Sequence, residues 1–400
     1  MSTRFLMRSG LLAVAAAMPF ACAQETTTPL QPSANVAPFA TGLVTLEWQE
    51  QARNLVAANR LNPLQAARVY AALSVAQSRA LNQADAVVPA SEADPTGFGP
   101  GGRSRYEARR GAVAGASARV LGFLFPAAAN QLEQTLNAQG DAGPGHVHPQ
   151  FTSAIAMGHT AGDAMINHLQ KDGFTKPWTG TVPSGPGLWI PSALPPAGGV
   201  LPDVTPYFLT SGSQFRPAPP PAFGSAAFNT DLNEVLTRSQ NRTADELAFA
   251  RHWDFSTGSP TPIGFWNGVA ADYVAQSNLD ERAATQVFAL MQPAIFDALI
   301  GCWDAKYHYW VLRPTQANSA ISLAFALPNH PSFPSGHSCA SASAARVLTH
   351  FFPDRVGQLN GWVNDAGLSR IIAGIHYRFD IKAGETLGRS VADWAIAHAQ

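Results

Sequence analysis

Apolar residues recur at three- and four-residue spacing along most of this 400-residue chain, and this helical period limits what it can fold into. The segments with this spacing are 46–81 (broken at Asn62-Pro63), 106–124, 127–136, 149–171, 243–253, 262–277, 279–312, 335–352, 356–375 and 381–398. Alternating strand patterns are almost absent, and no internal repeat is evident. We therefore predict an all-α fold.

One stretch interrupts the helical pattern. Residues 175–227 are dense in Pro and Gly and have no helical period. A loop of this length is unusual inside a compact domain, so we expect it to wrap the surface or cover a site, with a plain interdomain strap as the alternative. We predict an N-terminal helical bundle at 45–174, a connecting segment at 175–240, and a C-terminal bundle at 241–400.

The first residues have the pattern of an export signal. Arg4 and Arg8 precede an apolar run at 11–20, and Ala21-Cys22-Ala23 offers a cleavage site of small residues. The run is shorter than the roughly 20 residues of a membrane span. We expect a signal peptide at 1–23, a linker at 24–44, and a secreted or periplasmic protein without stable membrane insertion.

Charge and cysteine content narrow the classes of partner. The 26 Lys and Arg residues balance 27 Asp and Glu, for a net charge of -1, so no nucleic-acid partner is expected. Cleavage of the signal would leave Cys302 and Cys339. They could form one disulfide or remain as buried free thiols, and both alternatives stay open.

Three short clusters in the second half carry the candidate chemistry. The first places Lys306 seven residues before Arg313 and Pro314. On one helix this step returns to the same face about 10 Å along the axis, with Pro314 ending the helix. Because the surrounding residues are apolar and aromatic, we expect both cations to be buried and to need an anion. The alternative is a solvated basic face.

The second cluster is Pro334-Ser335-Gly336-His337, where a Pro-rich loop meets an apolar helix. Ser335 can cap that helix, and the free amides of the first turn with side-chain-free Gly336 suit an oxyanion. The alternative is an ordinary cap followed by a surface histidine.

The third cluster runs from Ser369-Arg370 to His376 and Asp380. If helical, the last two would meet on one face, and the carboxylate would fix the tautomer of the ring. Arg370 adds a third cation with fork geometry suited to oxyanions. The alternative is a surface His–Asp pair.

Taken in order, KxxxxxxRP, PSGH and SRxxxxxHxxxD resemble the superfamily of type 2 phosphatidic-acid phosphatases, bacterial class A acid phosphatases and vanadium-dependent haloperoxidases. The resemblance implies that the oxyanion of vanadate or phosphate is bound by Lys306, Arg313, Ser335, the Gly336 amide and Arg370. It makes His376 the axial ligand of vanadium, or the nucleophile of a phosphatase. His337 would be the acid/base, and Asp380 would orient His376.

Four stretches resemble bacterial vanadium haloperoxidase-type proteins in particular. They are RTADELAFARHWD, TPIGFWN, DALIGCWDAKYHYW and HPSFPSGHS. The resemblance implies a haloperoxidase that uses vanadate, hydrogen peroxide and a halide to make hypohalous acid. The alternative is a secreted acid phosphatase that hydrolyses a phosphate ester through a phosphohistidine intermediate.

The residue at position 330 bears on the halide. His330 lies seven residues before His337, where the resemblance puts a histidine in bromoperoxidases and an aromatic residue in chloroperoxidases. Bromide or iodide is therefore expected, although a loop histidine bonded to backbone is the alternative. Trp303 and Phe333 could line the halide pocket or belong to the core.

Overall fold

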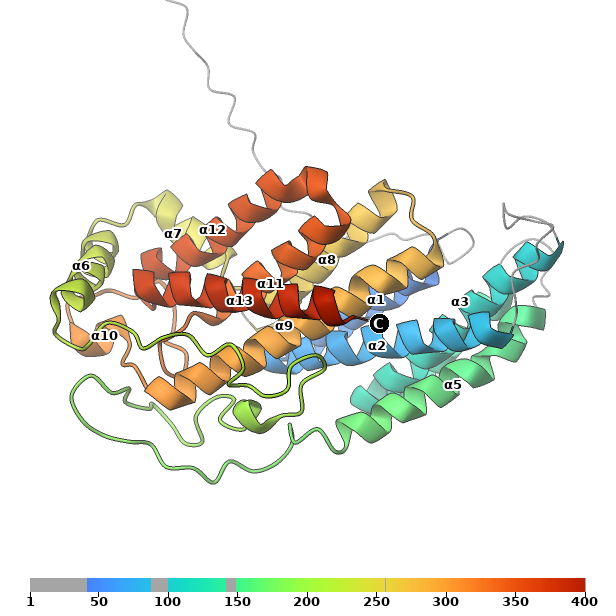
Figure 1. Cartoon of the computed structure of the whole chain (residues 1–400), viewed down its shortest axis with the longest axis horizontal. Helices are drawn as coiled ribbons and strands as arrows, with labels where there is room; N and C mark the ends of the chain where they lie inside the picture. The colour runs from blue at the N-terminus through green and yellow to red at the C-terminus, as the bar shows by residue number, and fades with distance from the viewer. Residues whose placement is uncertain (1–41, 88–99, 142–148, 256, 400) are drawn as a thin grey trace, which may run out of the picture. The chain divides into compact units, whose positions relative to one another are not determined.

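The computed structural model describes residues 42–87, 100–141, 149–255 and 257–399, and over these residues the chain is all-α (Figure 1). The described segments contain no strand, only isolated bridges. The all-α prediction is confirmed. The predicted signal peptide and most of the predicted linker lie outside the described residues. The helices are α1 Val44–Ala58, α2 Pro63–Val87, α3 Pro100–Leu124, α4 Ala129–Asp141, α5 Pro149–Leu169, α6 Ala226–Gln240, α7 Ala244–His252, α8 Thr261–Gln276, α9 Glu281–Tyr309, α10 Pro314–Ala317, α11 Gly336–Phe351, α12 Val356–Ile372 and α13 Arg378–His398.

Small residues let the helices pack closely. In the α3–α5 pair, a Cβ atom on Gly158 would lie 2.2 Å from the carbonyl oxygen of Ala112. In the α11–α13 pair, a Cβ atom on Gly388 would lie 2.3 Å from the carbonyl oxygen of Cys339. Real side chains do not approach this closely, so both helix pairs depend on glycine at these positions.

One hydrophobic core extends from α1 and α2 through α8 and α9 to α11 and α13. Residues 39–400 accordingly form one compact unit. Helix α9 lies within this core and packs against α2, α11 and α13. The boundary expected between an N-terminal and a C-terminal bundle stays a prediction.

Among the helices of the described segments, α9 alone is long and apolar enough to cross a membrane. In the fold, 83% of its most apolar 18-residue window is buried. Helix α9 therefore lies inside the protein as a core helix does.

The expected connecting segment contains a helix that the sequence reading missed. Helix α6 begins at the N-cap Ser225, whose side chain accepts a hydrogen bond from the amide of Phe228. Phe228 and Val235 then bury one face of the helix. The prediction that helical pattern resumes only at residue 243 is wrong, because this cap and apolar spacing were masked by the Pro-rich residues before them.

The ends of α9 and α12 also differ from expectation, and both ends matter for the site. Helix α9 stops at Tyr309, because Trp310 adopts a left-handed conformation with φ of 52°. Arg313 is consequently not on α9, and Pro314 begins α10 rather than ending α9. Helix α12 stops at Ile372, so His376 lies in the link to α13 and not on a helix.

The Pro/Gly-rich segment packs against α9. The carboxylate of Asp297, buried in α9, accepts hydrogen bonds from the amides of Tyr207, Phe208 and Leu209 at 2.7–3.0 Å. One turn before the end of α9, Asp304 accepts two hydrogen bonds from Arg216. The segment therefore runs along the helix that carries Lys306.

Candidate oxyanion site

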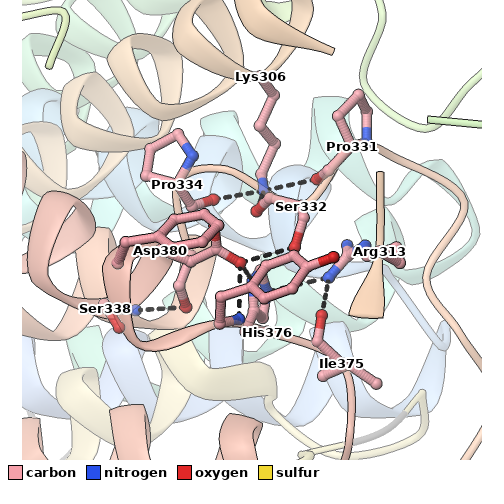
Figure 2. A network of polar contacts seen from close by, with 12 residues as sticks. Lys306, Arg313, Pro331, Ser332, Pro334, Ser338, Ile375, His376 and Asp380 are labelled. Atoms are coloured by element: carbon pink, nitrogen blue, oxygen red, sulfur yellow. Dashed lines mark hydrogen bonds and ion pairs between the residues drawn. The ribbon is translucent and has the colours of Figure 1, made fainter. Parts of the chain in front are cut away.

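Lys306 lies in the last turn of α9 and is fully buried. Its ammonium group donates to the carbonyl oxygens of Pro331 at 2.9 Å and Ser332 at 2.8 Å, and also to that of Pro334 (Figure 2). These three contacts use all three ammonium protons. Burial, together with the positive charge of Arg313, lowers the pKa of Lys306 from 10.5 to about 8.

Arg313 lies between α9 and α10, where it is the N-cap residue of α10. Its Nη1 donates to the carbonyl oxygen of Ile375 at 2.7 Å and contacts Nε2 of His376 at 3.1 Å. Its Nε donates to the carbonyl oxygen of His330 at 3.0 Å, and Nη2 lies 3.0 Å from Nδ1 of the same residue. Burial lowers the pKa of Arg313 to about 10, so the guanidinium stays charged at neutral pH.

His376 and Asp380 make the contact expected from the sequence, by a different route from a shared helix face. Nδ1 of His376 lies 2.7 Å from Oδ2 of Asp380, which sits in the first turn of α13. The same oxygen accepts from the hydroxyl of Ser332 at 2.6 Å and from the amide of Tyr377 at 3.0 Å. A loop residue followed by a helix start therefore brings the pair together (Figure 2).

The two contacts of the His376 ring define its protonation. Burial is the main cause that lowers its pKa well below 6.5, so the ring is neutral. A guanidinium can only donate, so Nε2 accepts from Arg313 and the single ring proton is on Nδ1, facing Asp380. The lone pair of Nε2 therefore points at the cations. Burial raises the pKa of Asp380 to about 6, and that carboxyl is ionised at neutral pH.

Ser335 caps α11 as predicted, since its hydroxyl accepts a long hydrogen bond, 3.4 Å, from the amide of Ser338. Its own amide donates to the carbonyl oxygen of Asp380 at 3.0 Å. The next residue, Gly336, faces the ring of Trp303, which a Cβ atom there would approach to 3.1 Å. The first residue of α11 therefore has little room for a side chain.

Arg370, near the end of α12, is buried. Its Nη2 donates to the carbonyl oxygen of Ala250 at 3.1 Å, its Nε to the hydroxyl of Ser369 at 3.0 Å, and its Nη1 to Asp254 at 3.4 Å. The sequence reading missed Asp254. Asp254 ends the stretch RTADELAFARHWD, but that resemblance assigned it no contact with Arg370.

His337 faces the same loop as Arg370. Its Nε2 lies 3.0 Å from the carbonyl oxygen of Trp253, which can only accept, so Nε2 carries a proton. Burial and then the charge of Arg370 hold the pKa of His337 well below 6.5. The ring is therefore neutral, and Nδ1 is its basic nitrogen.

The three sequence clusters converge around His376. The positive charges that depress its pKa are those of Arg313, Lys306 and Arg370. Within the described residues, hydrogen bonds occupy four of the five N–H groups of Arg313 and three of the five of Arg370. The two arginines thus keep free donors for an anion, whereas Lys306 adds charge and holds the 331–334 loop.

The three candidate halide residues lie in different surroundings. His330 contacts Arg313 and lies against Trp303, with ring centroids 4.9 Å apart. The indole of Trp303 donates to the carbonyl oxygen of Ala197 at 2.8 Å. Phe333 belongs to a buried apolar cluster with Phe228 and neighbouring aromatic residues. His330 and Trp303 therefore border the cations, and Phe333 packs behind the loop.

Cys302 and Cys339 are both buried free thiols in this structure, which decides between the two alternatives left open by the sequence. The described residues contain no group of three His, Cys, Asp or Glu side chains that could hold a metal cation. The site instead offers the neutral imidazoles of His376 and His337 among several positive charges. This arrangement suits an anion better than a bare cation.

One segment of the chain matches the sequence model of a known family. Residues 284–399 match the family model described as the PAP2 superfamily, and they include all three clusters. This part of the chain is similar in sequence to the PAP2 superfamily. A curated relative, the non-specific acid phosphatase of Providencia stuartii, is 26% identical over 219 residues, covering 52% of this chain and 83% of that protein.

Solved structures with the same fold extend the likeness to nearly the whole chain. A bacterial vanadium-dependent iodoperoxidase is similar with a TM-score of 0.74 and 23% identity, covering 92% of this chain and 99% of the other. The apo form of a bacterial vanadium-dependent chloroperoxidase has a TM-score of 0.65 at 17% identity, covering 83% of this chain and 91% of the other. At these identities the likeness establishes the fold.

Proposed function

We propose that this protein is a vanadium-dependent haloperoxidase, which converts hydrogen peroxide and a halide into hypohalous acid and water. One observation carries the proposal: a neutral histidine, His376, directs the lone pair of Nε2 at Arg313 inside a buried group of cations. The likeness in fold to an iodoperoxidase over 92% of the chain supports it. The predicted signal peptide would place the reaction outside the inner membrane.

The donor set fits vanadate. His376 offers an unprotonated ring nitrogen as its ligand, and Arg313 and Arg370 have free N–H groups for its oxygens. Lys306 adds positive charge, and the Ser335-Gly336 start of α11 offers the N-terminal end of a helix. When bound, vanadate would supply a Lewis acid that polarises peroxide for attack by halide.

The side chains around His376 would have separate roles in this reaction. Asp380 holds the proton of His376 on Nδ1 and so keeps Nε2 available. Burial of Lys306, Arg313 and His376 excludes water, which strengthens their interaction with an anion. His337 can accept a proton on Nδ1 as peroxide enters and return it as water leaves. The reaction consumes one hydrogen peroxide, one halide ion and one proton, and it produces one hypohalous acid and one water.

We propose bromide or iodide as the halide. The motivating observation is His330, whose ring lies between Arg313 and Trp303, so that the cation site is bordered by a polar ring rather than by a hydrocarbon one.

The second candidate is an acid phosphatase, which the relative from Providencia stuartii favours. Nε2 of His376 would attack phosphorus as the ester bond breaks. Nδ1 of His337 would take a proton from the bound phosphate monoester and pass it to the leaving oxygen. Water would then hydrolyse the phosphohistidine to inorganic phosphate. The same cations would stabilise the equatorial oxygens, so the geometry serves both reactions.

A paired assay separates the two functions. One portion of the purified protein is loaded with orthovanadate and given peroxide, bromide or iodide, and a phenolic dye. A vanadate-free portion is given a phosphate monoester. The proposal predicts halogenation that requires vanadate and disappears in His376→Ala. Robust ester hydrolysis without any halogenation at saturating vanadate would establish the phosphatase instead.

A further inference from the structure

Part of the Pro/Gly-rich segment is fastened onto the loops of the site. We call residues 187–199 the strap. Its first residues pair with the chain just after α9: the amide of Trp189 donates to the carbonyl oxygen of Trp310 at 2.7 Å, and the amide of Leu312 donates to that of Gly187 at 3.1 Å. The strap therefore starts directly beside Arg313.

Asn329 fastens the middle of the strap. Its Oδ1 accepts from the amide and the hydroxyl of Ser192, both at 3.0 Å, and from the amide of Ala193 at 3.4 Å. Its Nδ2 donates to the carbonyl oxygen of Ala193 at 2.9 Å, and its own carbonyl oxygen accepts from the amide of Ala197 at 2.8 Å. This side chain thus replaces backbone pairing for a segment that has no regular structure.

The strap returns to the site through Ala197. The carbonyl oxygen of Ala197 accepts from the indole of Trp303 at 2.8 Å and from the hydroxyl of Tyr307 at 2.7 Å. Trp303 in turn packs against the ring of His330, the residue after Asn329. His330 is consequently held from two sides, by the backbone of Asn329 and by the ring of Trp303.

His330 connects the strap to Nε2 of His376 through Arg313. It contacts Arg313 twice, through its carbonyl oxygen and through Nδ1, both at 3.0 Å. Arg313 then contacts Nε2 of His376 at 3.1 Å. An arginine held at two points loses little freedom when it binds an oxyanion, so the pre-organisation of Arg313 should appear as affinity.

We propose that Asn329 is a positioning residue of the oxyanion site: by fastening the strap, it fixes His330 and through it the guanidinium of Arg313. This inference rests on the proposed binding of an oxyanion at His376. Asn329 itself is partly exposed, so water can solvate the strap amides that its removal would release. Its loss should therefore affect anion binding more than the stability of the fold.

The test measures the binding of inorganic phosphate by calorimetry in the full-length protein. We expect Asn329→Ala to weaken phosphate affinity about 3- to 10-fold. This factor corresponds to the net free energy of about one hydrogen bond, which would no longer hold Arg313 in its binding position. The matched control is Asn318→Ala, because Asn318 lies in the same region and its side chain bonds only the amide of Ala320 among the described residues. The control should bind phosphate as the unaltered protein does.

A double-mutant cycle shows whether the effect passes through His330. His330→Ala removes the Nδ1 contact with Arg313 and keeps the contact of the backbone carbonyl. In this background Asn329→Ala should therefore weaken phosphate binding by a smaller factor than it does in the unaltered protein. Asn329→Ser, which keeps one accepting oxygen, should lose less affinity than Asn329→Ala and serves if the alanine variant does not fold.

The outcomes are distinguishable. Full affinity in both Asn329 variants, an equal loss in Asn318→Ala, or an undiminished loss in the His330→Ala background would each overturn the inference while leaving the proposed function intact. No phosphate binding by the unaltered protein would instead defeat the proposed function, and this inference with it.

Discussion

The guanidinium of Arg313 donates a hydrogen bond to Nε2 of His376 at 3.1 Å, although the two residues are 63 positions apart in the chain. This contact identifies the tautomer of the histidine and places a permanent cation on the nitrogen that would bind vanadium or phosphorus. It also joins the first sequence cluster to the third. The chemistry proposed for the site depends on this pair.

Replacing Lys306 should cost stability as well as anion affinity. In Lys306→Met, three buried carbonyl oxygens, those of Pro331, Ser332 and Pro334, lose their donor. We expect a loss of about 2–4 kcal/mol in the free energy of unfolding, measured by urea denaturation. The control, Lys382→Met at an exposed position of α13, should stay within about 0.5 kcal/mol. Equal stability of the two variants would contradict the role given to the ammonium group.

The lowered pKa of Lys306 predicts how phosphate binding depends on pH. Burial brings this pKa to about 8, below the ordinary 10.5. The ammonium is charged below pH 8 and becomes neutral above it, so phosphate affinity should fall as the pH rises from about 8 toward 9.5. Fold stability changes in the opposite direction, because over this window the unfolded chain binds more protons.

The comparison for this pH dependence is Lys306→Arg, whose guanidinium stays charged throughout the same range. Calorimetric titrations at several pH values should show a flatter profile for this variant. Identical profiles in both proteins would show that Lys306 does not titrate as its burial requires.

Asp380 should be needed for activity but should weaken the fold at neutral pH. Asp380→Asn removes the carboxylate that orients His376, and we expect turnover to fall about 10- to 100-fold. Burial raises the pKa of this carboxyl from 3.8 to about 6. Between pH 3.8 and pH 6 the folded protein therefore binds more protons at this position than the unfolded chain does. The unaltered protein should therefore lose up to about 3 kcal/mol of stability as the pH rises from 3.8 to 6.

Denaturation curves across this range check the expectation for Asp380. The Asn variant should lack this part of the pH dependence, because it has no proton to bind at this position. A variant with full turnover, or with the same pH dependence as the unaltered protein, would remove Asp380 from the site.

The helices were predictable where periodicity and end signals agree. Thr243 and Glu246 form a capping box at the start of α7, and Asn62-Pro63 marks the start of α2. The left-handed turn at Trp310 was not predictable, since non-glycine residues rarely adopt this conformation and tertiary contacts must hold it. For this reason Lys306 and Arg313 converge across a helix end and not along one helix face.

The sequence names the residues of the candidate site but not the contacts between them. The motifs named Lys306, Arg370 and His376, because cations and imidazoles in an apolar setting need an anion. Nothing in the sequence shows that the protons of Lys306 are used by backbone carbonyls, or that Asp254 faces Arg370. These contacts join segments distant along the chain, and only the packing of α7, α9 and α12 brings them together.

A crystal structure of the protein grown with orthovanadate tests the central claim most directly. The account predicts vanadium bonded to Nε2 of His376, with its oxygens facing Arg313 and Arg370. Vanadate bound elsewhere, or a His376 that remains bonded to Arg313 alone at saturating vanadate, would contradict it.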